Sequence, residues 1–199
     1  QVERGDDERV AEDAERLGVG FARACAQAGA DVVVAARRVD RLLDAAQMVE
    51  AEGRRALVVG PDIADPEACQ ALVADALAAF GRVDVLVNNA GVGAAVPATH
   101  ETTEQFRNVM EVNLHGAYWV AQACGRVMGP GSSIINISSG LARFSVPGSS
   151  AYAAMKGAVE VFTRYLAKEL GARGITANTV APGAVMTDFS GGIVRDNPV

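Results

Sequence analysis

Residues 134–156 read IINISSGLARFSVPGSSAYAAMK, and this stretch decides the interpretation of the chain. Residues 134–137 predict a buried strand that ends at two serines, Ser138 and Ser139. A loop follows, and a helix then carries Tyr152 and Lys156, which share one face because they are four residues apart. A serine at the end of a parallel strand lies on the rim where open α/β sheets bind ligands. The stretch can therefore hold a hydroxyl, a phenol and an ammonium around one substrate oxygen.

The choice of lysine at position 156 adds to this interpretation. The chain has 18 Lys and Arg residues together, and only Lys156 and Lys168 are lysines. A plain positive charge is thus usually supplied by Arg, so a lysine four residues after Tyr152 indicates a need for a compact ammonium on a flexible stem. A surface lysine beside a half-buried tyrosine on an amphipathic helix explains the same spacing. The pair alone leaves both interpretations open.

Length and composition bound the class of protein. With 199 residues, half of them apolar and 21 of them Gly, the chain is expected to be one globular domain with a single core. The net charge of −6 without a basic block argues against a nucleic-acid partner. No apolar run reaches membrane-spanning length and no signal peptide is visible, which argues against a membrane protein and predicts a cytoplasmic one. Three distant cysteines in Ala-rich helical patterns predict buried thiols rather than a disulfide or a metal site.

Strand and helix patterns alternate along most of the chain. A helix is expected from near Asp6 toward Ala28, followed by further helices at 39–52, 66–80, 101–128 and 150–170. Short apolar runs predict strands at 32–36, 56–60, 83–87, 134–137 and 175–180. This alternation predicts an α/β fold, a Rossmann-like doubly wound parallel sheet in a single domain.

With these elements placed, six motifs occur in a familiar order. They are Gly18-Val19-Gly20 opening a helix, Asn88-Asn89-Ala90-Gly91 after a strand, Asn113 in the long helix, Ser139, Tyr152-x-x-x-Lys156, and Pro182-Gly183-x-x-x-Thr187. Over roughly residues 17–199 the chain resembles the short-chain dehydrogenase/reductase family of nicotinamide-dependent oxidoreductases. This set of motifs is similar to that of 3-oxoacyl-carrier-protein reductases and of sugar or steroid dehydrogenases.

The resemblance implies a catalytic set of Asn113, Ser139, Tyr152 and Lys156. Tyr152 would be the general acid/base toward a small-molecule carbonyl or alcohol substrate, and Ser139 would hydrogen-bond the substrate oxygen. The Lys156 ammonium is expected to lower the pKa of Tyr152 from about 10 toward neutrality. Asn113 would interrupt its helix and hold a water leading to Lys156. The family also implies a homodimer or homotetramer formed through the helices containing Asn113 and Tyr152.

The cofactor can be argued from charge. An NAD enzyme needs an acidic residue after the strand at 32–36, but this chain has Arg37 and Arg38 there. Because Arg37 can bind a 2′-phosphate bidentately, NADP(H) is expected over NAD(H), which stays possible. Two solvated arginines that start a helix are the alternative. The resemblance implies the remaining cofactor contacts: Leu17, Gly18, Val19, Asp62, Ile63, Asn89, Ala90, Gly91, Tyr152, Lys156, Pro182, Gly183, Val185 and Thr187.

Both ends of the chain depart from the family pattern. Asp13 and Ala14 stand where the family has Thr and the first Gly of its phosphate-binding turn, and the residues before them are too charged for a buried strand. We therefore expect residues 1–13 not to be native family sequence, with the central first strand and the last strand and helix missing. Two functions remain: an NADP(H)-dependent oxidoreductase that interconverts a carbonyl and a secondary alcohol, or a catalytically silent binding or assembly subunit.

Overall fold

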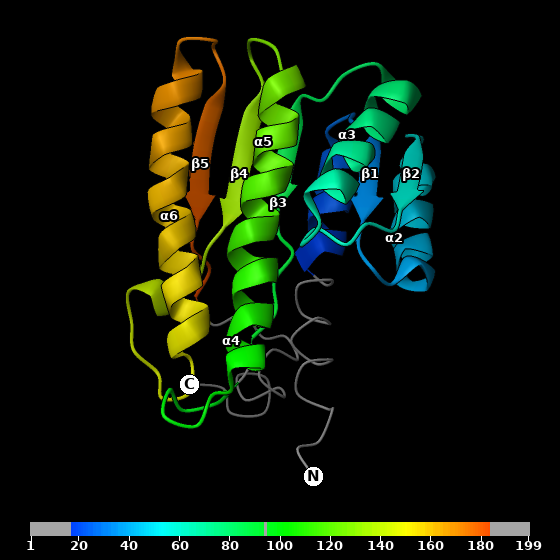
Figure 1. Ribbon diagram of the computed structural model, residues 1–199. Helices are drawn as coiled ribbons and strands as arrows, with labels where there is room; N and C mark the ends of the chain where they lie inside the picture. Colours follow the sequence, from blue (N-terminus) through cyan, green and yellow to red (C-terminus); the bar gives the residue numbers. More distant parts are fainter. Residues whose placement is uncertain (1–16, 94, 184–199) are drawn as a thin grey trace.

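The expected alternation of strands and helices is present throughout residues 17–93 and 95–183, which this computed structural model describes. Each predicted end within these residues lies within two positions of the observed one. After the helical residues 17–27, the elements are β1 (Val32–Ala35), α2 (Val39–Ala51), β2 (Ala56–Val59), α3 (Pro66–Phe80), β3 (Val85–Asn88), α4 (Thr103–Met110), the π-helix η1 (Glu111–Gly116), α5 (Ala117–Val127), β4 (Ser133–Ile137), the 3₁₀ turn η2 (Gly140–Ala142), α6 (Ser150–Gly171) and β5 (Thr176–Val180). Figure 1 shows this order.

Local capping explains where two of the helices begin. Asp65 caps α3 by accepting a hydrogen bond from the Glu67 backbone N–H at 3.0 Å, and Pro66 occupies the first turn. Thr102 and Gln105 form a reciprocal capping box at the start of α4, with bonds of 2.9 and 3.2 Å. These caps fix the chain direction on entry to each helix after the carboxyl end of a strand.

All strand pairs are parallel, but the described strands form two sheets. One sheet pairs β1 with β2, from Val32 opposite Ala56 to Ala35 opposite Val59. The other has the order β3–β4–β5. Within the described part of the chain, the break falls between β1 and β3. In the family pattern these two strands flank the first strand, which we expected to be missing here.

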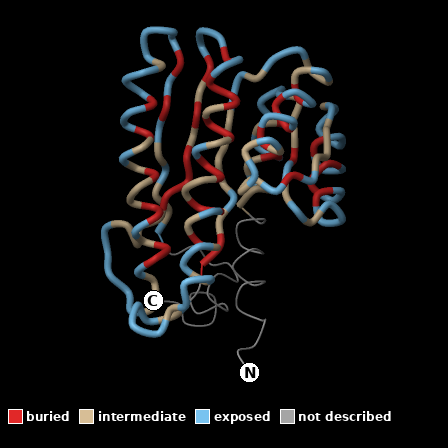
Figure 2. Tube along the Cα trace, in the orientation of Figure 1, coloured by how far each residue is buried: buried red, intermediate tan, exposed pale blue. Residues whose placement is uncertain are grey.

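Two main cores hold the helices to the sheets, and α3, which packs on α5, also contacts β2 (Figures 1 and 2). One core joins α3, α5 and α6 to β4 and β5, and its most buried members include Cys69, Ala121, Ile134 and Ile175. The other core joins the helical residues 17–27 and α2 to β1, and is centred on Ala26, Val34 and Val49. The longest helix, α6, thereby lies against the sheet that carries the serine-ended strand β4.

The three cysteines are free thiols. Burial raises the pKa of Cys69 to about 11 and that of Cys124 to about 12, so both are neutral packing groups at pH 7. Among the residues that the structure describes, no helix combines the length and apolar character needed to cross a bilayer. The same residues contain no group of three or more His, Cys, Asp or Glu side chains suited to hold a metal ion.

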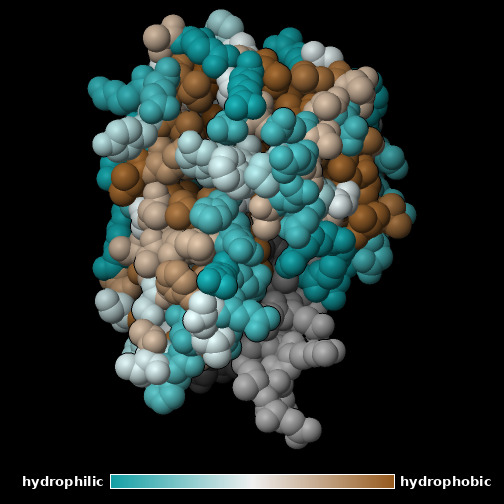
Figure 3. Space-filling view, in the orientation of Figure 1, coloured by the Kyte–Doolittle hydropathy of each residue, from teal (hydrophilic) through white to brown (hydrophobic). Residues whose placement is uncertain are grey.

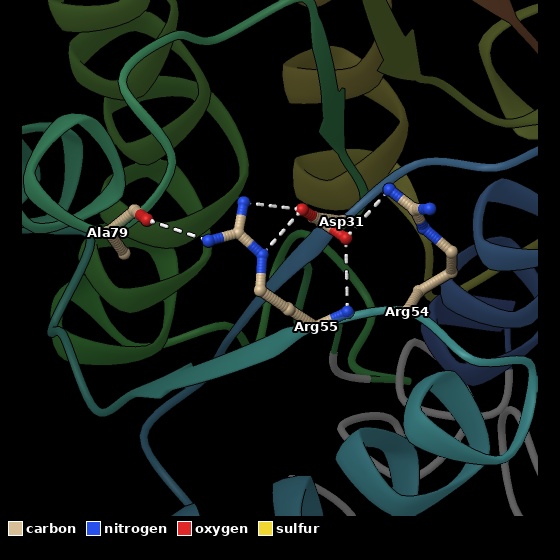
Figure 4. Close-up of polar contacts among 4 residues, drawn as sticks. All are labelled: Asp31, Arg54, Arg55 and Ala79. Atoms are coloured by element: carbon tan, nitrogen blue, oxygen red, sulfur yellow. Dashed lines mark hydrogen bonds and ion pairs between the residues drawn. The ribbon is translucent and has the colours of Figure 1, made fainter.

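A polar clamp centred on Asp31 joins β1, β2 and α3 at the amino ends of the strands (Figure 4). The Asp31 carboxylate accepts hydrogen bonds from the Arg55 backbone N–H at 3.0 Å and from Arg55 Nε at 2.7 Å. Arg54 Nη2 lies 2.9 Å from the same carboxylate. Arg55 also donates to the Ala79 carbonyl at 3.3 Å and lies over the Phe80 ring. The clamp thus anchors the two-stranded sheet to the end of α3, away from the carboxyl ends of the strands.

We expect Asp31→Asn to lower the thermal unfolding midpoint at pH 7. Hydrogen bonds and the charges of Arg55 and Arg54 hold the pKa of Asp31 below its ordinary value. A depressed folded-state pKa gives stability that is present above the unfolded value, about 3.9, and that is lost as the pH falls through the folded value. The unfolding midpoints of the parent chain and of Asp31→Asn, measured from pH 7 to pH 2.5, should therefore differ less at acid pH than at pH 7. Asp75→Asn, at an exposed position on α3, is the control, and an equal loss in both variants would contradict the role of the clamp.

Candidate active site

Many of the predicted site residues follow the carboxyl ends of the five strands, and the others lie in helices. Because the strands within each sheet are parallel, their carboxyl ends share one edge, the lower one in Figure 1. Val185 and Thr187 lie outside the described residues. The others lie as follows: Arg37 after β1, Asp62 and Ile63 after β2, Asn89, Ala90 and Gly91 after β3, Ser139 after β4, Pro182 and Gly183 after β5, Leu17, Gly18 and Val19 in the helical residues 17–27, Asn113 in η1, and Tyr152 and Lys156 in α6.

Tyr152 and Lys156 lie on the buried face of α6, as their spacing predicted. The Lys156 side chain turns toward the end of β4, where its Nζ donates to the Ile137 carbonyl oxygen at 2.9 Å. The same Nζ lies 5.5 Å from the centroid of the Tyr152 ring. Phenol and ammonium are therefore held side by side at the serine end of β4, which rules out the interpretation of Lys156 as a surface lysine.

The expectation that Lys156 lowers the pKa of Tyr152 is wrong for this structure. Burial raises the pKa of Tyr152 to about 12, because removing the phenolate from water disfavours the charged form, and a hydrogen bond from Ser139 offsets only part of this. The pKa of Lys156 is itself lowered by burial, to about 8. Burial therefore decides the direction of both pKa shifts, and Tyr152 is a protonated phenol at pH 7.

The two serines at the end of β4 have different partners. Ser139 is hydrogen-bonded to the Tyr152 side chain, and its Oγ also accepts from the Leu141 backbone N–H at 3.2 Å. Ser138 is buried and donates to the Lys156 carbonyl oxygen at 3.1 Å. The structure thus brings Ser139 to the phenol, while Ser138 bonds the backbone of α6.

Asn113 lies in the π-helical turn η1 that interrupts the long helix between α4 and α5. Such turns are frequent at functional sites, because they re-aim a side chain without ending the helix. Asn113 Nδ2 donates to the carbonyls of Val92 at 2.6 Å and of Val109 at 2.9 Å. Its buried Oδ1 has no hydrogen-bond partner among the described residues. This acceptor fits the expected water-holding role of Asn113.

Gly91 brings Asn113 and Lys156 to one place. A Cβ on Gly91 would lie 2.8 Å from Asn113 Oδ1 and 3.3 Å from Lys156 Nζ, so both polar atoms border the backbone that follows β3. A Cβ on Gly18 would likewise lie 3.3 Å from Asn89 Nδ2. Both glycines keep the backbone close to polar side chains at this edge: an added Cβ would clash at Gly91 and would be tight at Gly18.

The residues present fit a nicotinamide cofactor. The exposed Arg37 follows β1, and the half-buried Arg38 precedes α2, so the position that holds an acidic residue in NAD enzymes is basic here. Lys156 has three N–H donors, one of which meets the Ile137 carbonyl among the described residues, and the others can meet ribose hydroxyls. Gly140 N–H donates to the Pro182 carbonyl at 2.8 Å, which fixes the backbone after β5 against the loop after Ser139.

A family model for short chain dehydrogenases matches residues 13–198, which is nearly the whole chain. This chain belongs to the short-chain dehydrogenase/reductase family. An uncharacterized oxidoreductase of Methylorubrum extorquens is 38% identical over 173 residues, which cover 86% of this chain and 70% of the relative. Versicolorin reductase 1 of Aspergillus parasiticus is 35% identical over 182 residues, covering 90% of this chain and 70% of that protein.

Solved structures of the family have the same fold. A dehydrogenase/reductase from Sinorhizobium meliloti superposes with a TM-score of 0.82 at 35% identity, covering 86% of this chain and 70% of the other. A short chain dehydrogenase from Burkholderia cenocepacia in complex with NADP gives 0.84 at 37% identity, with coverage of 90% and 76%. The predictions of an α/β Rossmann-like fold in a single domain and of an enzyme of this family are confirmed.

Sequence reasoning missed a buried polar chain behind the site of this short-chain dehydrogenase. Asn88 Nδ2 donates to Asn136 Oδ1 at 2.9 Å and to the Ala117 carbonyl at 3.0 Å. Asn136 Nδ2 in turn donates to Thr163 Oγ1 at 2.8 Å. The signal was the asparagine inside the apolar run IINI, since a buried strand tolerates an amide only with partners. Glu160, also missed, lies four residues beyond Lys156 and receives a hydrogen bond from Ser138.

Gly91→Ala should lower the free energy of unfolding by about 1–3 kcal/mol, because the new methyl group overpacks a buried site. The methyl would meet Asn113 Oδ1 and Lys156 Nζ, as described above. Gly157→Ala is the matched control, since a Cβ there meets nothing within 4 Å. That helical substitution should stabilise the chain by about 0.5–1 kcal/mol. Urea unfolding measures both, and a Gly91→Ala chain as stable as the parent would contradict the close packing.

Proposed function

We propose that this chain is an NADP(H)-dependent oxidoreductase that interconverts a carbonyl and a secondary alcohol, with Tyr152 as the general acid/base. The observation that carries the proposal is the grouping of Ser139, Tyr152 and Lys156 at the end of β4. Hydride transfer is the chemistry that a bound nicotinamide supplies. The protein must then move one proton at the substrate oxygen and hold that oxygen in place.

The protonation states favour the reductive direction. Tyr152, with a pKa of about 12, carries its proton at pH 7 and can donate it to a carbonyl oxygen that gains charge. The Ser139 hydroxyl would hydrogen-bond the same oxygen. Lys156 lies beside the ring and would stabilise the phenolate that remains. We assign Asn113 a positioning role, because its partnerless Oδ1 borders Gly91 and Lys156 and suits a bound water that returns the proton.

We assign the cofactor to the carboxyl edge of the strands. Arg37 would bind the 2′-phosphate, and Lys156 and Tyr152 the nicotinamide ribose. A relative at 37% identity has a structure in complex with NADP, which supports this choice. Another relative, at 36% identity, is named L-rhamnose 1-dehydrogenase (NAD(P)(+)) of Sphingomonas, so NAD(H) stays possible. The other proposed contacts are Leu17, Gly18, Val19, Asp62, Ile63, Asn89, Ala90, Gly91, Pro182, Gly183, Val185 and Thr187.

We further propose a cytoplasmic homodimer or homotetramer. The helices containing Asn113 and Tyr152 expose large apolar side chains, Phe106, Tyr118, Val161 and Tyr165 among them. Apolar side chains are visible on the face of the molecule that presents these helices (Figure 3). The free thiols suit a reducing compartment. Light scattering of the purified chain over a range of concentrations tests the assembly, and a monomer at every concentration would overturn it.

Tyr152→Phe should lower kcat by at least about 10²-fold while the dissociation constant for NADPH changes less than about twofold, since the phenol moves the proton but the ring still packs. Turnover is followed by loss of NADPH absorbance with a panel of ketones, and binding by NADPH fluorescence. Tyr165→Phe, at an exposed position on the same helix, is the matched control. Full activity of Tyr152→Phe would refute the assigned role.

The alternative function is a catalytically silent binding or assembly subunit. One observation favours it: the described strands form two sheets, and the break lies between the strands that flank the expected cofactor turn. The NADPH titration separates the two functions. Binding with turnover supports the oxidoreductase, and an assembled chain that does not bind NADPH supports the silent subunit.

Arg37→Ala should weaken NADPH binding about tenfold or more, because a charge-assisted bond to the 2′-phosphate contributes roughly 1.5–3 kcal/mol. NADH binding should hardly change, because NADH lacks that phosphate. Arg164→Ala, an exposed arginine on α6, controls for the general loss of positive charge. Fluorescence titration with both nucleotides gives the ratio of the dissociation constants for NADPH and NADH. Tighter binding of NADH than of NADPH by the parent chain would overturn the proposed preference for NADP(H).

A further inference from the structure

Glu160 lies on α6 one turn beyond Lys156 and continues the row formed by Tyr152 and Lys156. Its Oε1 accepts a hydrogen bond at 3.0 Å from Ser138 Oγ, and the Ser138 residue is 3% exposed. Ser138 Oγ also points to the Lys156 carbonyl oxygen at 3.1 Å. One hydroxyl proton is thus shared between two acceptors of the same helical turn. The end of β4 is therefore bound to the turn of α6 that begins at Lys156.

The other carboxylate oxygen of Glu160 points to the loop. Arg143 Nη2 lies 3.4 Å from Glu160 Oε2, and Arg143 follows the 3₁₀ turn η2 directly. The Glu160 side chain is 17% exposed and the Arg143 side chain 65%. An exposed arginine in such a pair contributes little to stability by itself. Its effect is to restrict the loop that carries it.

Ser139 stands between these two attachments. Its neighbour Ser138 is bonded to one oxygen of Glu160, and Arg143 is paired with the other. The backbone between them turns tightly, with Ala142 N–H donating to the Ser139 carbonyl at 3.0 Å and Arg143 N–H to the Gly140 carbonyl at 2.8 Å. A carboxylate that holds both ends of this short segment restricts where the Ser139 hydroxyl can point.

We propose that Glu160 is a positioning residue that fixes the Ser139 hydroxyl against Tyr152 by holding the strand end and the following loop to α6. This inference rests on the proposed function for its catalytic consequence, but its structural part stands without it. Glu160 is not a counter-charge for Lys156. The Lys156 ammonium points to the Ile137 carbonyl and the Tyr152 ring, and both oxygens of Glu160 have other partners.

Hydrogen–deuterium exchange of the ligand-free chain tests the positioning directly. Glu160→Ala should raise exchange several-fold at the amides of the strand end, 138–139, and of the loop, 140–143, and leave the β4 core amides, 134–136, near their parent rates. Glu160→Gln should release only the loop amides, because the Gln oxygen still accepts from Ser138 while its NH₂ group cannot pair with Arg143. Arg143→Ala should match Glu160→Gln, and Glu169→Ala, at an exposed position on α6, should change neither segment.

Two results would overturn the proposal. Equal exchange in Glu160→Ala and Glu169→Ala would show that Glu160 restrains nothing, and a uniform rise over all described amides would show a role in global stability alone. If Glu160→Ala does not fold, Glu160→Gln and Arg143→Ala still test whether the pair of Glu160 and Arg143 restrains the loop amides. In an active parent chain, Glu160→Ala should lower kcat about tenfold with little change in NADPH affinity. A parent chain without turnover would refute the proposed function but not the exchange result.

Discussion

The site depends on one buried ammonium. The Lys156 residue is only 3% exposed, and removing such a charge from water costs several kcal/mol unless a partner compensates. Here the compensation comes from the carbonyl of Ile137, the last residue of β4, at 2.9 Å. The ammonium therefore has its place only while α6 lies against β4 in one register. Ser138 enforces that register from the other side, because it bonds the carbonyl of Lys156 itself.

Buried amides behind the site make that register specific. An apolar core alone tolerates sliding of α6 along the sheet, but Asn136 is fully buried and must keep its partners. It accepts from Asn88 on β3 and donates to Thr163 on α6, and Thr163 donates to the Val159 carbonyl at 2.7 Å. A slip of one residue in β4 would bury these polar groups unpaired or expose them. The amides thus fix where β4 ends, and so where Ser139 stands.

The fold and much of the site could be predicted from the sequence, because short apolar runs and four-residue spacings are local properties. The places of Arg37, Asn89 and Ser139 just after strand ends follow directly from these local patterns. The direction of the Tyr152 pKa shift could not be predicted in this way. The sequence shows a nearby lysine, but it does not show that both groups lose their contact with solvent. The meeting of Gly91, Asn113 and Lys156 is likewise a property of packing among three distant segments.

The proposed catalytic residues lie at one sheet, whereas the proposed cofactor contacts are divided between both sheets, so the alignment of the site depends on the contacts that join the two. Asn113, Ser139, Tyr152 and Lys156 are placed by β3, β4 and their helices, whereas Arg37 and Asp62 follow β1 and β2. One joint lies in the π-helical turn itself: a Cβ on Gly116 would come within 2.7 Å of the Ile63 side chain after β2. The turn that carries Asn113 therefore also presents a bare backbone to the loop after β2. The same local distortion of one helix thus places Asn113 and brings the long helix against the segment after β2.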